Sequence, residues 1–271
     1  MSKTKKDMSF LQHLEELRWL LVRSFGVVLF FGIVAFIFKG FIFDKIIFVF
    51  QDADFITYKV LCSISKIFGS EGLCIEETTF NIQSLKMAEQ FSAHIWMSLT
   101  FGFILAFPYV VYEIWKFLKP ALHKEEQKHA KSFILFSSFL FFLGILFGYY
   151  ILAPLTINFF GNYSVSDTIQ RNFKLGSYIT IVKTAVLSAG FLFELPIVIY
   201  FLTKLGLVTP EFLRKNRKYS LVIILILAAI LTPADILSQI VVAIPMLFLY
   251  ELGIIISKRI VKKQKAALAK G

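Results

Sequence analysis

A chain of 271 residues is long enough for one or two soluble domains, but its composition excludes the soluble class. Hydrophobic residues make up 57% of the chain, 32 residues are Phe, and the mean hydropathy is +0.73. Such values lie far outside the range of soluble proteins and indicate an integral membrane protein. The net charge of +11 follows from the Lys and Arg content of the loops, so it does not indicate a nucleic-acid partner.

Six apolar stretches are predicted to be membrane helices. They are roughly residues 20–38, 91–115, 132–155, 178–202, 219–231 and 236–256. The first four reach the roughly 20 residues that cross about 30 Å of hydrocarbon. The fifth covers only about 20 Å at 1.5 Å per residue. The sequence therefore predicts a single all-α membrane domain over residues 1–271, with six helices of which the fifth and sixth are short.

The distribution of basic residues predicts the orientation in the membrane. If both termini face the cytoplasm, the inner segments hold 21 of the 29 Lys and Arg residues, as short cytoplasmic loops usually do. The chain is therefore predicted to be a multi-pass protein of the cytoplasmic membrane. Residues 1–19 are expected to form an amphipathic cytoplasmic helix, residues 39–90 a long outer loop, and residues 257–271 a basic cytoplasmic tail.

The outer loop contains the only two cysteines, Cys62 and Cys74. In an oxidising compartment these thiols can form a disulfide that closes a short loop, which would stabilise the loop by about 3 kcal/mol. Two unpaired thiols are the alternative, and the sequence leaves the choice open.

The chain shows no constellation typical of an enzyme. Its four histidines, His13, His94, His123 and His129, share no metal-ligand spacing, and there is no Gly-rich phosphate loop. We therefore expect a protein that is not an enzyme and that uses neither a metal nor another cofactor.

Two pairs of acids stand against the basic cytoplasmic face: Glu15 with Glu16, and Glu125 with Glu126. Ordinary solvated ion pairs are one interpretation, because Lys and His residues lie one turn from the second pair. The other interpretation is a paired-acid site for a cationic ligand. Arg would suit such a site, because its planar fork bonds a carboxylate through two parallel hydrogen bonds.

Glu194 is an acid inside an apolar run and is followed by Pro196. A carboxylate at the centre of a membrane helix costs about 3 kcal/mol on insertion scales, so it calls for a reason. Two alternatives are a tolerated polar contact inside the helix bundle and the titrating group of a proton-coupled secondary transporter. Lys183 lies 11 residues earlier on the same helix face, and the sequence assigns it no role.

Four segments together resemble the TatC family, the membrane receptor subunits of the twin-arginine protein translocase. They are HLEELRWLL from His13, FPYVVYEIWKFLKPALHKEE from Phe107, FLFELP from Phe191, and LTPADILSQIVVAIPMLFLYELG from Leu231. The segments occur in the family's order at the expected ends of the spans. The resemblance implies a concave, cup-like bundle of six helices with both termini in the cytoplasm.

The resemblance also implies a function and partners. TatC proteins recognise folded precursors that carry a Ser-Arg-Arg-x-Phe-Leu-Lys type of signal peptide. They work with single-span TatA-type and TatB-type subunits in the lipid bilayer, in receptor complexes that hold several copies, and the proton motive force drives export. This protein is therefore expected to do the same, with the proton-coupled transporter that uses Glu194 as the alternative.

The resemblance assigns the signal-peptide site to two acids and three neighbouring side chains. The acids are Glu16 and Glu126, with Glu15 and Glu125 as the register alternatives, and the neighbours are Arg18, Phe117 and Pro120. It also implies that Glu194 faces the concavity as a wet groove position.

Three further residues match polar positions of the family near the last two helices: Asp235, Gln239 and Glu251. A helix cap or bundle contact on the one hand, and contact with a partner on the other, are both open for them. One departure from the family pattern is Glu113, where Gln is expected. It lies near the inner end of the second span, where a long acid can reach the interface.

Overall fold

The computed structural model describes residues 10–52, 54–67, 80–119, 130–166, 172–231 and 236–268, which are mostly helical. By their contacts the residues divide into two compact units. The first unit comprises residues 1–39 and 94–139, and the second comprises residues 40–93 and 140–271. Because α3 and α5 each cross from one unit to the other, the division does not coincide with helix ends.

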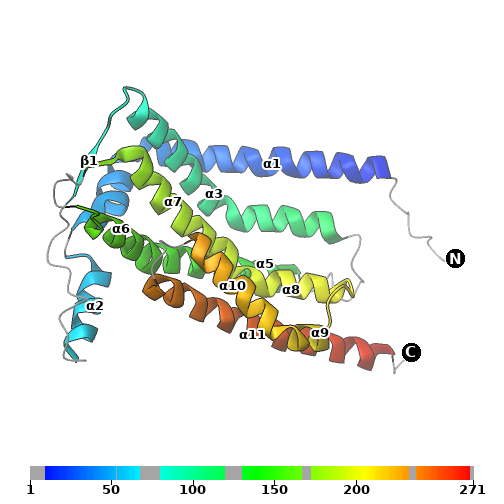
Figure 1. Ribbon diagram of the computed structural model, residues 1–271. Helices are drawn as coiled ribbons and strands as arrows, with labels where there is room; N and C mark the ends of the chain where they lie inside the picture. Colours follow the sequence, from blue (N-terminus) through cyan, green and yellow to red (C-terminus); the bar gives the residue numbers. More distant parts are fainter. Residues whose placement is uncertain are drawn as a thin grey trace. The chain divides into compact units, whose positions relative to one another are not determined.

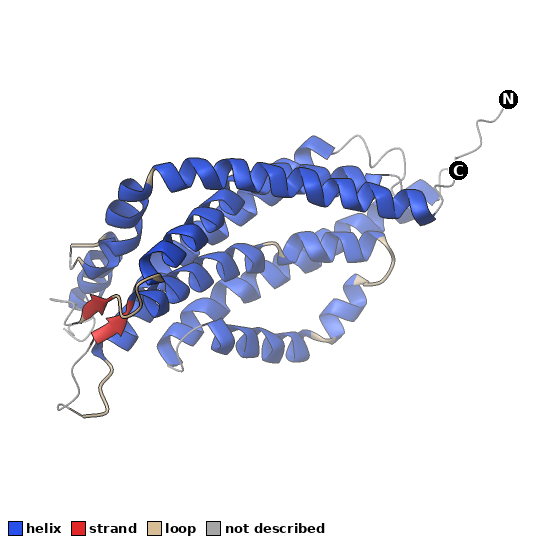
Figure 2. Ribbon diagram, turned by 90° about the horizontal axis from the view of Figure 1, so that it is seen from above, coloured by secondary structure: helices blue, strands red, loops and turns tan. Residues whose placement is uncertain are grey.

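Figure 1 labels the main elements in chain order, and Figure 2 distinguishes the helices from two short strands. The elements are α1 (Phe10–Ile37), η1 (Phe41–Ile47), η2 (Phe48–Gln51), α2 (Ile56–Ile67), β1 (Asn81–Gln83), α3 (Glu89–Leu118), α5 (Ala130–Phe147), η4 (Gly148–Leu152), α6 (Ala153–Asn162), β2 (Asn172–Lys174), α7 (Leu175–Phe193), α8 (Leu195–Lys204), α9 (Pro210–Lys215), α10 (Arg217–Leu231) and α11 (Ile236–Leu268).

The prediction of an all-α membrane protein is confirmed. In the described part of the chain, five helical stretches are long and apolar enough to cross a membrane: Gln12–Ile37, Glu89–Leu118, Lys131–Asn162, Leu175–Lys204 and Gln239–Lys262. The predicted short fifth helix is α10, which has 15 residues. The sixth helix is longer than predicted, because α11 continues past residue 256 through a basic segment that contains neither Gly nor Pro.

In the first unit, α1 and α3 approach each other closely at two glycines. A Cβ atom built on Gly102 would lie 2.5 Å from the carbonyl oxygen of Val28 and 2.6 Å from the backbone nitrogen of Gly32. Such an approach of two backbones is typical of small residues in membrane helix pairs. Nearer the C-terminal end of α1, the ring of His94 stacks on Phe36 with 3.7 Å between the ring centroids.

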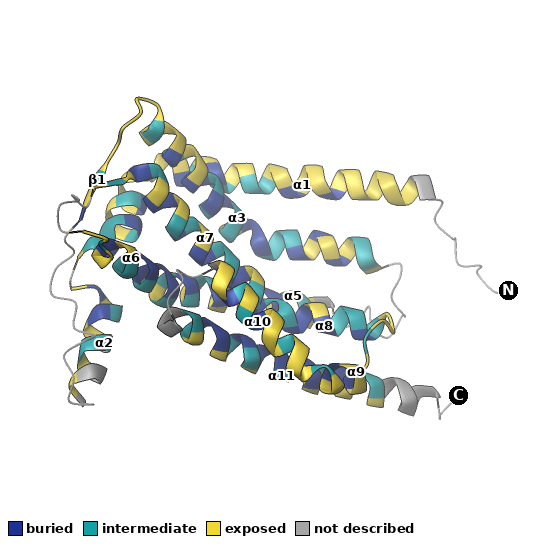
Figure 3. Ribbon diagram, in the orientation of Figure 1, coloured by how far each residue is buried: buried dark blue, intermediate teal, exposed yellow. Residues whose placement is uncertain are grey.

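The helix α1 runs without interruption from Phe10 to Ile37. From Phe10 onward, the predicted amphipathic segment and the first span are therefore one helix, and the position of its first turns on the membrane stays a prediction. Figure 3 shows that much of α1 is exposed. The exposed side chains of its apolar part include Phe25, Phe30 and Ile33, as expected for residues that face lipid.

In the second unit, the prediction that the third span ends near residue 155 was wrong. The helix passes through the π-helical turn η4 and continues as α6 to Asn162, with Pro154 in the first turn of α6. A proline fits that position, because the N–H groups of a first helical turn need no partner within the helix. Pro154 is also fully buried.

The predicted outer loop contains η1, η2, α2 and β1, and tyrosines from three elements hold its irregular part. Tyr58 of α2 donates to the Phe50 carbonyl at 3.0 Å, Tyr149 of η4 to the Ile46 carbonyl at 2.9 Å, and Tyr178 of α7 to the Ile47 carbonyl at 2.6 Å. Burial raises the pKa of Tyr58, which keeps this hydroxyl a donor. These bonds satisfy carbonyl groups where the helical geometry is irregular.

Two short strands join distant loops of the second unit. β1 pairs in parallel with β2, with Ile82 opposite Phe173 (Figure 2). The side chain of Glu89, at the start of α3, accepts hydrogen bonds from the backbone N–H groups of Leu85 and Gly176 at 2.9 and 3.0 Å. One carboxylate thus links the segments that follow the two strands.

The fourth span is divided at Glu194 into α7 and α8. Pro196 has no N–H and cannot bond the carbonyl four residues earlier, so the ladder is interrupted there. The carbonyl of Glu194 accepts bonds from Ile197 and Val198 at 2.9 and 3.0 Å and starts the new helix. α8 then packs along α11 (Figure 1), where the buried hydroxyls of Thr203 and Ser257 are hydrogen-bonded at 2.9 Å.

We predict that Gly102→Ala lowers the free energy of unfolding by about 1–3 kcal/mol, the usual range for overpacking. The new methyl group would collide with backbone atoms of α1, which cannot rotate away as a flexible side chain can. Thermal unfolding of the purified protein in detergent, followed by Trp fluorescence, measures the effect. Gly26→Ala is the matched control, because a Cβ there meets nothing within 4 Å. Equal responses at the two positions would contradict the close approach.

Candidate functional site

A cavity of about 410 Å³ lies between α1 and α3 within the first unit. Its lining residues come from the first half of α1 and the last turns of α3. They are Gln12, Glu15, Glu16, Trp19, Leu20, Arg23, Glu113, Lys116 and Phe117. The volume falls within the range of about 300–1,000 Å³ that is usual for small-ligand pockets.

The helical repeat explains why these residues share a cavity. The lining positions of α1 recur every three or four residues, and those of α3 do the same, so each set forms one face of its helix. Arg18 is two residues from Glu16, which places it on another side of α1, and it is exposed.

The cavity is mixed in charge, with an excess of acid. Three of its lining residues are acids, Glu15, Glu16 and Glu113, and two are bases, Arg23 and Lys116. Glu15 and Glu16 are exposed at the helix surface. The lining therefore carries a formal charge of −1 when all five groups are ionised. A ligand cation would be attracted to it.

Glu113 is the buried acid of the cavity. Its side chain is only 5% exposed, and its Oε1 accepts a hydrogen bond from the Tyr109 hydroxyl at 3.1 Å. Its Oε2 lies 3.6 Å from Nη1 of Arg23, whose side chain is 46% exposed. The Arg23 guanidinium carbon is also 6.0 Å from the centre of the Trp19 ring. The structure thus buries the residue that was expected to reach the interface.

An aromatic side chain forms another part of the wall. Phe117 of α3 is half-buried and stacks on His13 of α1, with 4.2 Å between ring centroids and 21° between the planes. Flat aromatic surfaces suit the face of a guanidinium, which stacks on them. A pocket with carboxylates and an aromatic wall is chemically suited to an arginine side chain.

The structure brings together some of the residues that the sequence assigned to the site. Glu15, Glu16 and Phe117 line one cavity, whereas Arg18 is not among its described lining. The other three assigned residues, Pro120, Glu125 and Glu126, lie outside the described residues.

Sequence reasoning did not assign Trp19, Arg23, Glu113 or Lys116 to the site. The spacing from Glu16 to Trp19 and Arg23 was a usable signal, because these positions follow the helical repeat. Glu113 stood out in the sequence as a departure from the family pattern. Its pairing with a base on another helix became visible only in the structure.

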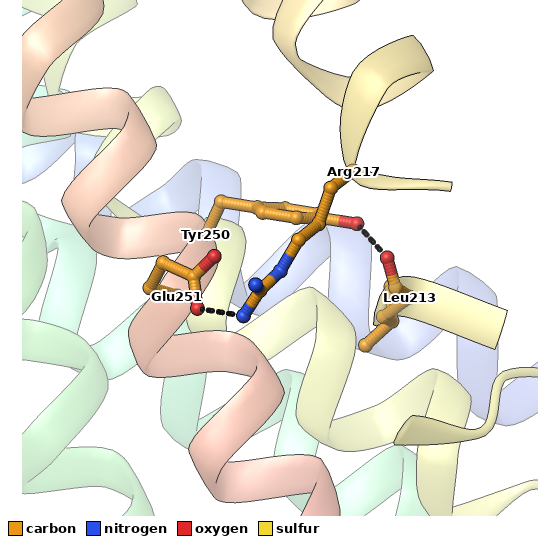
Figure 4. Close-up of polar contacts among 4 residues, drawn as sticks. All are labelled: Leu213, Arg217, Tyr250 and Glu251. Atoms are coloured by element: carbon orange, nitrogen blue, oxygen red, sulfur yellow. Dashed lines mark hydrogen bonds and ion pairs between the residues drawn. The ribbon is translucent and has the colours of Figure 1, made fainter. Parts of the chain in front are cut away.

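In the second unit, Glu251 of α11 forms an ion pair with Arg217 of α10 at 2.7 Å. Figure 4 shows this pair beside a second contact, in which the Tyr250 hydroxyl donates to the Leu213 carbonyl at 2.8 Å. The two contacts join α11 to the first residue of α10 and to the preceding helix α9. For Glu251 the structure therefore provides a contact within the chain.

Gln239 also contacts the neighbouring helix, since its Nε2 donates to the Leu225 carbonyl of α10 at 3.1 Å. Asp235, one turn earlier in the sequence, lies outside the described residues. Glu194 lies at the break between α7 and α8, and its Oε1 is buried. Lys183 is half-buried in α7.

Cys62 lies in α2 and is disulfide-bonded. Cys74, the second cysteine of the chain, lies outside the described residues. The predicted bond between the two therefore stays a prediction.

The comparisons with known proteins agree on one family. The family model of the Sec-independent protein translocase protein (TatC) matches residues 12–245. The Sec-independent protein translocase protein TatC of Blattabacterium sp. subsp. Periplaneta americana (strain BPLAN) is 41% identical over 266 residues, which cover 97% of this chain and 100% of that protein. The protein of the same name from Aquifex aeolicus (strain VF5) is 32% identical, over 95% of this chain and 98% of that one.

Two crystal structures of a twin-arginine translocase receptor, TatC, are also similar. One of them, determined in DDM, has a TM-score of 0.68 and 32% identity, and the match covers 90% of this chain and 99% of that chain. The other has a TM-score of 0.64 and 33% identity, over 91% of this chain and 98% of that one.

We predict that Glu251→Gln lowers the free energy of unfolding by less than about 1 kcal/mol, the range for exposed ion pairs, since both partners are about half exposed. Arg217→Gln should have a similar effect, and the double variant should be no less stable than the more affected single variant. Thermal unfolding of the four proteins in detergent gives the coupling. Fully additive losses would mean that the pair does not contribute as a pair.

Proposed function

This chain belongs to the TatC family of Sec-independent protein translocase proteins, and we propose that it is the receptor subunit that binds twin-arginine signal peptides of folded precursors. It is a multi-pass protein of the cytoplasmic membrane. The observation that carries the proposal is the cavity between α1 and α3, which Glu16 and Phe117 both line.

The chemistry of the cavity suits one arginine of a signal peptide. A guanidinium carries five N–H donors in a planar fork, so it can bond a carboxylate through two parallel hydrogen bonds and stack on an aromatic ring. Glu16, with Glu15 beside it, supplies the carboxylate, and Phe117 supplies the ring. A lysine would keep the charge but lose the fork, which is a physical basis for preferring Arg.

The second arginine is assigned to Glu126 in this proposal, with Glu125 as the register alternative. Pro120 would set the course of the chain between Phe117 and these acids, because proline fixes its own φ angle. Arg18 is exposed on another side of α1, so it would influence the peptide before it enters the cavity and would not contact it inside the cavity.

The protein would work within a larger system. We propose that TatA-type and TatB-type single-span subunits assemble with several copies of it in the bilayer, and that the proton motive force drives export. The whole chain would act as one membrane domain, with residues 1–19 and the basic residues 257–271 on the cytoplasmic side. Asp235, near the start of α11, is the remaining candidate for a partner contact, since Gln239 and Glu251 bond within the chain.

We predict that Glu16→Ala and Glu126→Ala each abolish export of a twin-arginine reporter. Each arginine would lose the charged hydrogen bonds of its carboxylate, at about 1.5–3 kcal/mol per bond. Reporter activity in the periplasmic fraction measures export, and immunoblotting of the membrane fraction measures the abundance of the protein, which should not change.

The matched control is Glu211→Ala, which removes an exposed acid on α9, outside the cavity. It should export normally. Normal export by the double variant Glu16→Ala, Glu126→Ala would contradict the assignment of both arginines.

We also propose that Glu194 keeps a polar groove within reach of the signal peptide. Glu194→Leu is therefore predicted to reduce export, because an isobutyl group in place of the carboxylate removes the polar surface at the α7–α8 break. Glu194→Gln, which keeps the polarity, should export better than the Leu variant. Full export by Glu194→Leu would leave Glu194 as a tolerated polar residue of the bundle.

A further inference from the structure

Glu113 is unusual among the residues of the cavity. Its side chain is only 5% exposed, yet it lines the cavity between α1 and α3 together with Glu16. A buried carboxylate needs a charge partner or hydrogen bonds, because transfer of an isolated ion from water is strongly unfavourable. Among the described residues, Glu113 has a neutral donor in Tyr109 and a cation in Arg23.

The ion pair between Arg23 and Glu113 is loose. Its N–O distance is 3.6 Å, whereas the Arg217–Glu251 pair of the same protein has 2.7 Å. Charge-assisted hydrogen bonds of this type usually measure about 2.7–2.9 Å. Arg23 therefore neutralises Glu113 without the short bond that a guanidinium and a carboxylate can form.

Arg23 is also well placed to leave. Its side chain is 46% exposed, so water can solvate the guanidinium when it moves away from Glu113. Its guanidinium carbon already lies 6.0 Å from the centre of the half-exposed Trp19 ring, so a cation–π contact can be kept when the guanidinium leaves Glu113. Glu113, by contrast, is fixed by burial and by Tyr109.

We propose that Glu113 is a further subsite for an arginine of the signal peptide, and that Arg23 occupies this subsite when no peptide is bound. The inference rests on the proposed function. On binding, the guanidinium of the peptide takes the place of the guanidinium of Arg23, so the same chemical group is exchanged. Glu16 and Glu113 line the same cavity from α1 and α3, so the cavity offers the peptide a carboxylate on each wall.

The exchange makes Arg23 a competitor of the ligand, and this distinguishes it from a purely structural residue. If Arg23 only stabilised the helix pair, its removal would weaken peptide binding or leave it unchanged. If it competes for Glu113, its removal strengthens binding. The sign of one measurement therefore decides between the two roles.

The test uses the full chain in lipid nanodiscs and two fluorescent synthetic peptides of the Ser-Arg-Arg-x-Phe-Leu-Lys type, one with Arg-Arg and one with Lys-Lys. Fluorescence anisotropy gives the Kd of each. Glu113→Gln keeps the size of the side chain and an acceptor for Tyr109 but removes the charge. It should weaken binding of the Arg-Arg peptide about tenfold, which corresponds to about 1.4 kcal/mol.

Arg23→Gln should lower the Kd of the Arg-Arg peptide, and the double variant Arg23→Gln, Glu113→Gln should bind as Glu113→Gln does. The matched controls are Glu211→Gln and Arg214→Gln, exposed on α9 outside the cavity, which should bind as the unchanged protein does. Thermal unfolding of every variant is recorded beside its Kd.

The outcomes separate this inference from the proposed function. Suppose that the protein without substitutions prefers the Arg-Arg peptide but that Glu113→Gln binds it equally well. This result would overturn the subsite and leave the proposed function in place. Weaker binding by both Arg23→Gln and Glu113→Gln, in step with lower melting temperatures, would also overturn it and leave a structural ion pair. An unchanged protein that does not prefer Arg-Arg would overturn the proposed function itself.

Discussion

A backbone N–H or C=O group that is shielded from water must find its partner inside the protein, and this constraint shapes several irregular parts of the described chain. Where the regular ladder fails, another group takes over. Three tyrosine hydroxyls bond the carbonyls of residues 46, 47 and 50. Two prolines, Pro154 and Pro196, stand in first helical turns, where a missing N–H leaves no gap.

Close helix contact has a consequence for the cavity. Gly102 lets α3 touch the α1 backbone, and Glu113 follows 11 residues later, about three turns along the helix. The two residues therefore lie on one face of α3, so the face that packs on α1 also carries the buried acid towards it. Beyond the glycine contact the helix pair presents larger side chains, including Trp19 and Phe117, and these enclose the cavity. Packing and recognition thus use the same helix face.

The sequence predicted those features that depend on local pattern. Apolar length identified the spans, and the family motif identified Glu16 and Phe117, which line one cavity in the structure. It did not predict contacts between distant residues. Arg23 and Glu113 are 90 positions apart, and the sequence around either residue does not indicate its partner. The strands β1 and β2 have three residues each, too few for a periodic signal. The sequence also does not predict that the third span continues past residue 155, because the π-helical turn that precedes Pro154 leaves no signal in the composition.

The proposed exchange at Glu113 also resolves a conflict in the design of such a site. A carboxylate that binds an arginine tightly must be desolvated, but an empty, desolvated carboxylate is unfavourable. An internal guanidinium that pairs loosely, as Arg23 does at 3.6 Å, satisfies both requirements. It holds the charge of Glu113 while the site is empty, and it yields to a ligand that can bond more closely. Because one guanidinium replaces another, the number of charges at Glu113 stays constant. The exchange is favoured by the shorter hydrogen bonds that the peptide can form and by the hydration that Arg23 regains.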